Sequence, residues 1–169
     1  MSKKPTIYSV VIPVYNEEES LKPLFSELLQ IMTPLNRSYE ILFVNDCSSD
    51  RSLSIIEGFQ QEFPEVVRLV NLTQRTGQTL GLRKGLDSAQ GEFVITLDAD
   101  LQNDPADIPA MIEKMEREGL DVISGWRKQR KDNGVIMTMS KIGNWVHRMV
   151  TGEKVHDHGC SLKVYRKET

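Results

Sequence analysis

Short apolar runs alternate with amphipathic segments along most of the chain, and this alternation restricts the fold more than any other feature. The first apolar run, residues 7–16, is rich in β-branched and aromatic side chains and closes with proline and asparagine, which predicts a buried strand. From Leu21 to Met32, apolar residues recur at helical spacing, which predicts a helix. The same patterns predict further strands at 39–46, 66–72, 91–98, 120–125 and 161–166, and further helices at 48–63, 77–89, 104–119 and 136–150.

Strands that alternate with helices of this length are typical of a mostly parallel sheet covered by helices on both faces. We therefore predict an α/β doubly wound sandwich. A chain of 169 residues is long enough for one domain with a hydrophobic core, and it contains no low-complexity linker and no internal repeat. We expect one domain over residues 1–169.

The charge and the cysteines narrow the class of protein. The net charge of −3 provides no overall attraction to nucleic acid, so we expect no nucleic-acid partner. Cys47 and Cys160 lie far apart and lack CxxC spacing, which argues against a disulfide framework or a zinc site and favours a cytosolic setting. No run approaches the roughly 18 apolar residues of a membrane span, so the chain as given is predicted to be soluble.

Polar clusters follow five of the predicted strands, at the end where each strand finishes. In open parallel sheets, ligands bind outside the carboxyl ends of the strands, because helix N-termini and short loops converge there. We therefore expect five loops to share one rim. Their sequences are PVYNEEE, VNDCSSD, NLTQRTGQ, LDADLQND and SGWRKQRKD.

Asp98 and Asp100 form a DxD pair after the fourth strand. Hard oxygen ligands two residues apart suit Mg²⁺ or Mn²⁺ shared with phosphate oxygens. The alternative is that these carboxylates cap the next helix. That alternative is weakened because Pro105 begins the helix and Asp104 or Asn103 can cap it.

Two other carboxylates could accept hydrogen bonds from a bound nucleotide. Asp46, at the end of the second strand, could accept hydrogen bonds from the N3–H of uracil or a similar base edge, or it could cap the helix after Ser48. Glu17 could accept ribose hydroxyls, or it could simply interact with the dipole of the helix that follows.

After the fifth strand the sequence becomes basic. Arg127, Lys128, Arg130 and Lys131 would complement a diphosphate or a lipid phosphate, although such runs are commonly solvated loops. Further on, the segment HDHG has two histidines without a third ligand nearby, which is a weak zinc signal. Its Asp157 is of more interest, because sugar transfer to an acceptor oxygen can use a carboxylate as base.

Taken together and in order, four segments resemble family 2 glycosyltransferases of the GT-A fold. They are VVIPVYNEEESL, EILFVNDCSSDRS, GQTLGLRKGLDSAQGEFVITLDADLQNDPADIP and DHGCSLKVYRKE, and the resemblance runs from about Ser9 to Lys167. The nearest branch is similar to polyprenyl-phosphate and dolichyl-phosphate sugar transferases.

That resemblance implies an enzyme that transfers a sugar, with inversion, from a nucleotide-diphosphate donor to a polyprenyl phosphate. A UDP-sugar is favoured, and GDP-mannose is the other candidate. The implied nucleotide pocket consists of Pro13, Tyr15, Glu17 and Asp46, and Asp98 faces the ribose and the metal. The remaining implied roles are Asp100 and Gln102 on the Mg²⁺ or Mn²⁺ ion, Arg127 and Arg130 on the donor diphosphate or acceptor phosphate, and Asp157 near the acceptor. On this basis the catalytic candidates are Asp100, Arg127 and Asp157.

The resemblance also implies segments that are not in this sequence. Family members continue beyond the YR strand with an acceptor-side segment and then amphipathic and transmembrane helices. We therefore expect a catalytic domain that lacks these parts and that is cytoplasmic or peripheral at the cytoplasmic face of the membrane. The oligomeric state is left open, a homo-oligomer included.

Other classes of protein remain as alternatives. A nucleotide-sugar-binding fragment without transferase activity would have the same motifs. A nucleotidyltransferase is disfavoured because PVYNEEES is not the Gly-rich, basic loop expected after its first strand. A phosphohydrolase of the DxDGT type is disfavoured because DADLQ lacks the Gly-Thr and follows the fourth strand rather than the first.

Overall fold

A single mixed sheet forms the centre of the molecule. The computed structural model describes residues 6–125 and 160–167. Within these residues, six strands lie in the order β3-β2-β1-β4-β6-β5. Their bounds are β1 Tyr8–Val14, β2 Tyr39–Asn45, β3 Val67–Asn71, β4 Phe93–Thr96, β5 Val122–Ser124 and β6 Lys163–Arg166. All six predicted strands are therefore present, each somewhat shorter than its apolar run.

The first four strands pair in parallel, with β1 between β2 and β4. Val11 of β1 pairs with Leu42 on one side and Thr96 on the other, and the β1 residues Val10, Val11 and Ile12 are fully buried. Burial on both faces explains why the central strands have continuous apolar runs instead of alternating ones.

The far edge of the sheet is built differently. Strand β6, from the end of the chain, lies antiparallel to both β4 and β5 and separates them. Since β5 is antiparallel to β6, it runs in the same direction as β1 to β4. Only β6 is reversed among the described strands, so the prediction of a mostly parallel sheet is confirmed.

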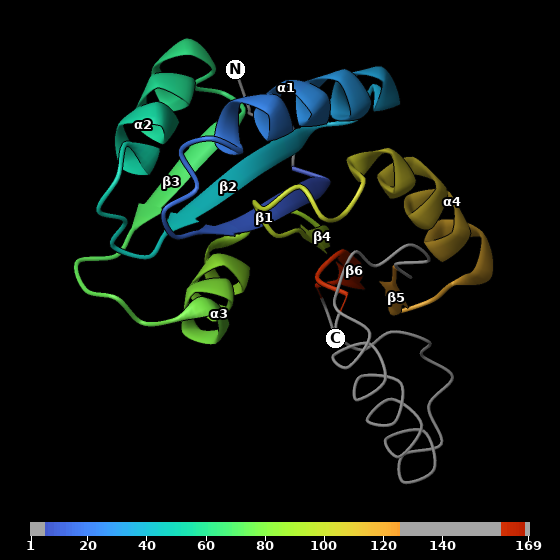
Figure 1. The fold of residues 1–169 in the computed structure, drawn as a ribbon. Coiled ribbons are helices and arrows are strands. Elements are labelled where there is room, and N and C mark those ends of the chain that lie inside the picture. Colours follow the sequence, from blue (N-terminus) through green and yellow to red (C-terminus); the bar gives the residue numbers. More distant parts are fainter. Residues whose placement is uncertain (1–5, 126–159, 168–169) are drawn as a thin grey trace, which may run out of the picture.

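Helices cover both faces of the sheet, as predicted (Figure 1). Helices α1, α2 and α4 pack on one face, and α3 packs on the other around Val11, Leu42, Val44 and Val94. The bounds are α1 Leu21–Met32, α2 Ser52–Glu62, α3 Gln78–Ser88 and α4 Ile108–Glu118, with short 3₁₀ helices η1 Thr33–Leu35 and η2 Pro105–Asp107. The predicted helix at 136–150 lies outside the described residues. In the part of the chain that is described, none of the helices has both the length and the apolar character needed to cross a bilayer.

Candidate functional site

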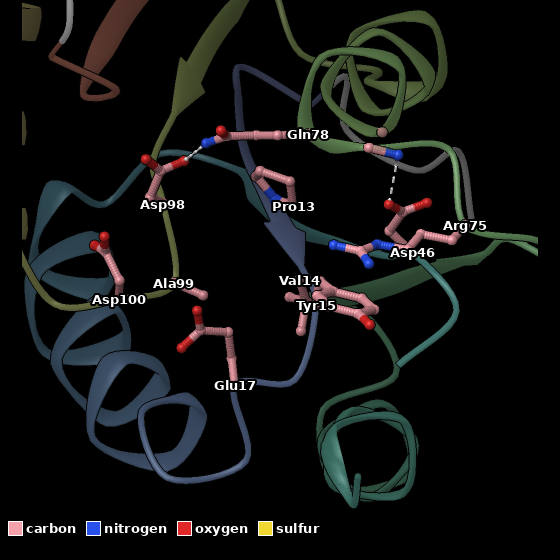
Figure 2. Close-up of a pocket in the computed structure, with 12 residues that line it drawn as sticks. Pro13, Val14, Tyr15, Glu17, Asp46, Arg75, Gln78, Asp98, Ala99 and Asp100 are labelled. Carbon is pink, nitrogen blue, oxygen red and sulfur yellow. Dashed lines mark hydrogen bonds between the residues drawn. The ribbon is translucent and has the colours of Figure 1, made fainter. Parts of the chain in front are cut away.

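A cleft lies at the carboxyl ends of β1, β2 and β4, as the rim predicted from the sequence requires. Figure 2 shows Asp98 and Asp100 on one side of it and Asp46, Arg75 and Tyr15 on the other. Its lining residues are Pro13, Val14, Tyr15, Glu17, Asp46, Arg75, Gly77, Gln78, Gly81, Asp98, Ala99 and Asp100. The structure thus brings together six predicted site residues: Pro13, Tyr15, Glu17, Asp46, Asp98 and Asp100.

Each of the three strands is followed by a sharp turn. Asn16, Cys47 and Leu101 have φ angles of 56°, 58° and 60°. This left-handed conformation is uncommon for residues other than glycine and costs on the order of 1 kcal/mol or more. Such turns redirect the backbone at the rim, and residues held this way cluster at functional sites.

The loops after β1 and β2 are bonded to each other. The backbone amides of Glu17 and Glu18 donate to Ser52 Oγ at 2.8 Å and to Asp50 Oδ2 at 3.1 Å. Asp50 Oδ1 also accepts from the amide of Ser52, the first residue of α2, at 2.9 Å. The Glu17 carboxylate in turn accepts from the hydroxyl of Ser20 at 2.8 Å. This network fixes the side of the cleft to which Glu17 belongs.

Asp46 holds the loop between β3 and α3. Its Oδ1 accepts hydrogen bonds from the amide and hydroxyl of Thr76 at 2.6 and 2.9 Å, and its Oδ2 accepts from the amide of Gly77 at 2.7 Å. Burial acts to raise the pKa of Asp46, but these hydrogen bonds, with a smaller contribution from the charge of Arg75, outweigh it and lower the pKa. Asp46 is therefore an anionic anchor of this loop and not the cap of α2, which corrects the alternative raised from the sequence.

The same loop contributes residues that the sequence reasoning missed. The guanidinium of Arg75 lies over the ring of Tyr15, 3.9 Å from its centroid, so a cation and an aromatic face meet at the cleft. Gly77, Gln78 and Gly81 also line it. The available signal was the polar segment QRTGQ between a predicted strand and a predicted helix, because that position places a loop at the rim.

The two aspartates of the DxD pair face the cleft from the loop after β4. Asp98 Oδ1 accepts a hydrogen bond of 2.8 Å from Gln78 Nε2 (Figure 2). Asp100 Oδ1 accepts from the backbone amide of Gln102 at 3.1 Å. The side chain of Gln102 is exposed and does not line the cleft, so its role as metal ligand stays a prediction. Asp104 caps η2 through the amide of Ala106, which confirms that the DxD pair is not needed for capping.

The donor set fits a hard divalent cation. Asp98 and Asp100 are carboxylates at the surface of one cleft, and neither forms an ion pair with another described residue. Three or more His, Cys, Asp or Glu side chains arranged for a metal are not found among the described residues. Two carboxylates suit Mg²⁺ or Mn²⁺ when a substrate phosphate supplies further oxygens.

A buried polar contact connects the DxD loop to the start of β6. Asn103 is 7% exposed; its Nδ2 donates to Ser161 Oγ at 2.8 Å, and its Oδ1 accepts from Cys160 Sγ at 3.2 Å. Thr96 Oγ1 also donates to the carbonyl of Ser161 at 2.7 Å. Cys160 and Ser161, which lead into β6, are therefore held beside the acidic loop. Asp157, Arg127 and Arg130, like Lys128, Lys131 and the two histidines of HDHG, lie outside the described residues.

Comparison with known proteins identifies relatives over most of the chain. The model of glycosyl transferase family 2 matches residues 9–169. A dodecaprenyl-phosphate galacturonate synthase from Rhizobium johnstonii is 40% identical over 162 residues, which are 94% of this chain and 47% of that protein. An undecaprenyl-phosphate 4-deoxy-4-formamido-L-arabinose transferase from Proteus mirabilis is 40% identical over 159 residues, 94% of this chain and 48% of that protein. The chain thus spans about half the length of the curated relatives it matches.

Solved structures share the fold. A mannosyltransferase from Pyrobaculum calidifontis in complex with GDP-Man and Mn²⁺ has a TM-score of 0.72 at 20% identity, covering 98% of this chain and 47% of that one. Glucosyl-3-phosphoglycerate synthase from Mycobacterium tuberculosis in complex with UDP has a TM-score of 0.70 at 18% identity, covering 96% and 57%. These likenesses confirm the predicted GT-A fold, and the two curated relatives confirm the predicted polyprenyl-phosphate branch. Because the family model matches residues 9–169 of its 169 residues, this chain belongs to glycosyl transferase family 2.

Proposed function

We propose that this chain is an inverting glycosyltransferase that moves a sugar from a nucleotide-diphosphate donor to a polyprenyl phosphate. The observation that carries the proposal is one cleft with Asp98 and Asp100 on one side and Tyr15, Asp46 and Arg75 on the other. The two parts of a nucleotide-sugar fit these two sides. Its anionic diphosphate would bind through a cation held by Asp98 and Asp100. Its flat base, which has hydrogen-bond donors, would lie beside Tyr15 and Asp46. A UDP-sugar is the favoured donor, and a GDP-sugar is the alternative.

Each part of the cleft has a role in this proposal. Tyr15 and Pro13 offer apolar surface to the base, and Asp46 keeps one acceptor site, on Oδ2, beyond the three used by Thr76 and Gly77, for a base N–H. Glu17, which lines the cleft, would accept hydrogen bonds from the ribose hydroxyls. Arg75 would supply a positive charge beside Tyr15, on the side of the cleft proposed for the base.

Asp98 and Asp100 would hold Mg²⁺ or Mn²⁺, with Gln102 as a further candidate ligand. When bound, such an ion offsets the negative charge that develops on the departing nucleotide diphosphate. Arg127 and Arg130 would act on the same charge or bind the acceptor phosphate.

Transfer with inversion takes place in one displacement. An oxygen of the polyprenyl phosphate bonds to the anomeric carbon, the bond from that carbon to the diphosphate breaks, and its electron pair leaves with the nucleotide diphosphate. A polyprenyl phosphate is already anionic at neutral pH, so little deprotonation is needed. Asp157 is therefore proposed to position the acceptor or to stabilise the transferred sugar rather than to serve mainly as base. The lipid acceptor places the reaction at a membrane surface.

The support from relatives is specific for the acceptor and general for the donor. Both curated relatives carry a polyprenyl phosphate in their names. Among the solved structures with this fold, one holds GDP-Man with Mn²⁺ and another holds UDP. One fact favours a second candidate, a nucleotide-sugar-binding fragment: the chain spans about half the length of its curated relatives.

The test combines binding with transfer. The chain is incubated with UDP- or GDP-sugars, Mn²⁺ or Mg²⁺, and undecaprenyl phosphate, and glycolipid formation is measured beside the thermal shift caused by each donor. We expect the largest shift with a UDP-sugar and loss of its metal dependence in Asp100→Asn but not in the exposed control Asp107→Asn. Donor binding without transfer would favour the binding fragment, and absence of any donor binding would contradict both.

A further inference from the structure

The first side chain of α3 reaches across the cleft to the DxD loop. Gln78 Nε2 donates to Asp98 Oδ1 at 2.8 Å, a contact between residues 20 positions apart in the sequence (Figure 2). Both residues line the cleft. The bond uses one carboxylate oxygen of Asp98, and the structure describes no hydrogen bond to the other, Oδ2.

We infer that Gln78 is a positioning residue that orients the Asp98 carboxylate for binding a divalent cation, an inference that rests on the proposed function. A carboxylate on a loop can rotate among several orientations, and a hydrogen bond to one oxygen selects among them. The amide donor is neutral, so it restricts the carboxylate without placing a positive charge beside a cation site. Partners that hold a ligating carboxylate in this way are known to tune metal affinity.

The backbone that carries Gln78 is itself held in place. The preceding residue, Gly77, has a φ of 87° and donates its amide to Asp46 Oδ2 at 2.7 Å. Its carbonyl accepts from the amide of Gly81, which closes the first turn of α3. Because the start of α3 is fixed from both directions, the reach of Gln78 toward Asp98 is set before any ligand binds.

A positioning role and a purely structural role predict different results for a variant without the Gln78 amide. A structural role would lower the melting temperature, whereas a positioning role lowers the metal affinity. The Gln78–Asp98 bond is exposed to solvent, where water can replace it, so it contributes little to folding. Removing the amide should therefore leave the melting temperature almost unchanged. Metal affinity should fall by about tenfold, the lower end of the range for residues that support a ligand.

The experiment measures Mn²⁺ binding by electron paramagnetic resonance in the presence of UDP. The variants are Gln78→Met, which keeps the length and removes the donor, Asp98→Asn, the double variant, and the control Gln30→Met on exposed α1 surface. We expect Gln78→Met to weaken Mn²⁺ binding by about tenfold, and Gln30→Met to leave it unchanged. In the Asp98→Asn background, Gln78→Met should have no further effect, because its partner carboxylate is gone.

The outcomes separate the two proposals. If the wild-type chain binds Mn²⁺ with UDP and Gln78→Met binds it equally well, only the role of Gln78 is overturned. The same holds if Gln78→Met weakens binding equally with and without the Asp98 carboxylate. If the wild-type chain with UDP binds Mn²⁺ no better than Asp98→Asn does, the metal-dependent donor site is overturned together with the role of Gln78.

Discussion

Asp46 and Thr76 are joined by two hydrogen bonds, from the amide and the hydroxyl of Thr76 to a single carboxylate oxygen, at 2.6 and 2.9 Å. This link ties the end of β2 to the loop that precedes α3. Arg75 and Gln78 flank the tied segment and face opposite sides of the cleft, toward Tyr15 and Asp98. The geometry of both sides therefore depends on one buried carboxylate.

Replacing Asp46 with asparagine should destabilise the protein and remove part of its acid sensitivity. Asparagine presents a donor where the carboxylate accepted, so we expect a loss of about 2 kcal/mol in the free energy of unfolding at pH 7. The lowered pKa of Asp46 means that its contribution is present above the ordinary carboxyl value of 3.8 and is lost as the pH falls through the lower folded value. Urea unfolding at pH 7 and near pH 3 checks this.

The control for this prediction is Asp107→Asn, which changes an exposed carboxylate in η2. It should unfold like the wild-type protein at both pH values. If the wild-type protein and Asp46→Asn differ by the same amount at pH 3 as at pH 7, the carboxylate does not carry the pH dependence.

The fold could be predicted because its signals are local. Central strands buried on both faces give continuous apolar runs, and helices such as α1 give a single apolar face, so periodicity alone finds them. The insertion of β6 between β4 and β5 could not be predicted, because pairing between strands that are far apart in the sequence leaves no local pattern. For example, Val164 pairs with both Ile95 and Ile123.

The carboxylates of the site could be predicted from the sequence, but Arg75 and Gln78 could not. Carboxylates at strand ends, such as Asp98 and Asp100, are conspicuous because they interrupt or end apolar runs. Arg75 and Gln78 lie in a polar loop where every residue type is ordinary, so their position at the cleft depends on the partners Tyr15 and Asp98 in other loops. Such partners come together only in the folded chain.

Replacing Arg75 with glutamine should weaken nucleotide binding. The variant loses the guanidinium over Tyr15, and with it a positive charge at the cleft, and we expect UDP affinity to fall roughly three- to tenfold, about 1 kcal/mol. The matched control is Arg83→Gln on the exposed surface of α3, which removes the same charge away from the lining. Calorimetric titration with UDP at low and high salt measures the effect. Equal losses in both variants would assign it to overall charge.

Replacing Asn103 with alanine should loosen the contact between the DxD loop and β6. The variant leaves the half-buried Ser161 and the buried Cys160 without their amide partner, and we expect a loss of about 2 kcal/mol in the free energy of unfolding. The Cys160 thiol, 3% exposed in the folded protein, should then react faster with a thiol reagent. The rate is measured in a Cys47→Ser background, because Cys47 is exposed.

The control for the thiol experiment is Gln102→Ala, which truncates the neighbouring exposed side chain. It should leave the Cys160 rate unchanged. An unaltered rate in Asn103→Ala would mean that the buried hydrogen bonds do not hold this segment against the sheet.

Replacing Gly85 with alanine should destabilise the protein, because α3 packs too closely on the sheet for a side chain at this position. A Cβ there would overlap Val11 Cγ1 and lie 2.9 Å from Val44 Cγ2. Overpacking of this kind costs about 1–3 kcal/mol.

Gly58 is the matched control, since it lies within α2 and a Cβ there meets nothing within 4 Å. Gly58→Ala should therefore stabilise by about 0.5–1 kcal/mol through helix propensity. Urea unfolding of the two variants should shift in opposite directions, and a stabilised Gly85→Ala would mean that α3 can move away from β1 and β2 at little cost. In that case the start of α3, and with it the reach of Gln78 toward Asp98, would not be fixed by packing on the sheet.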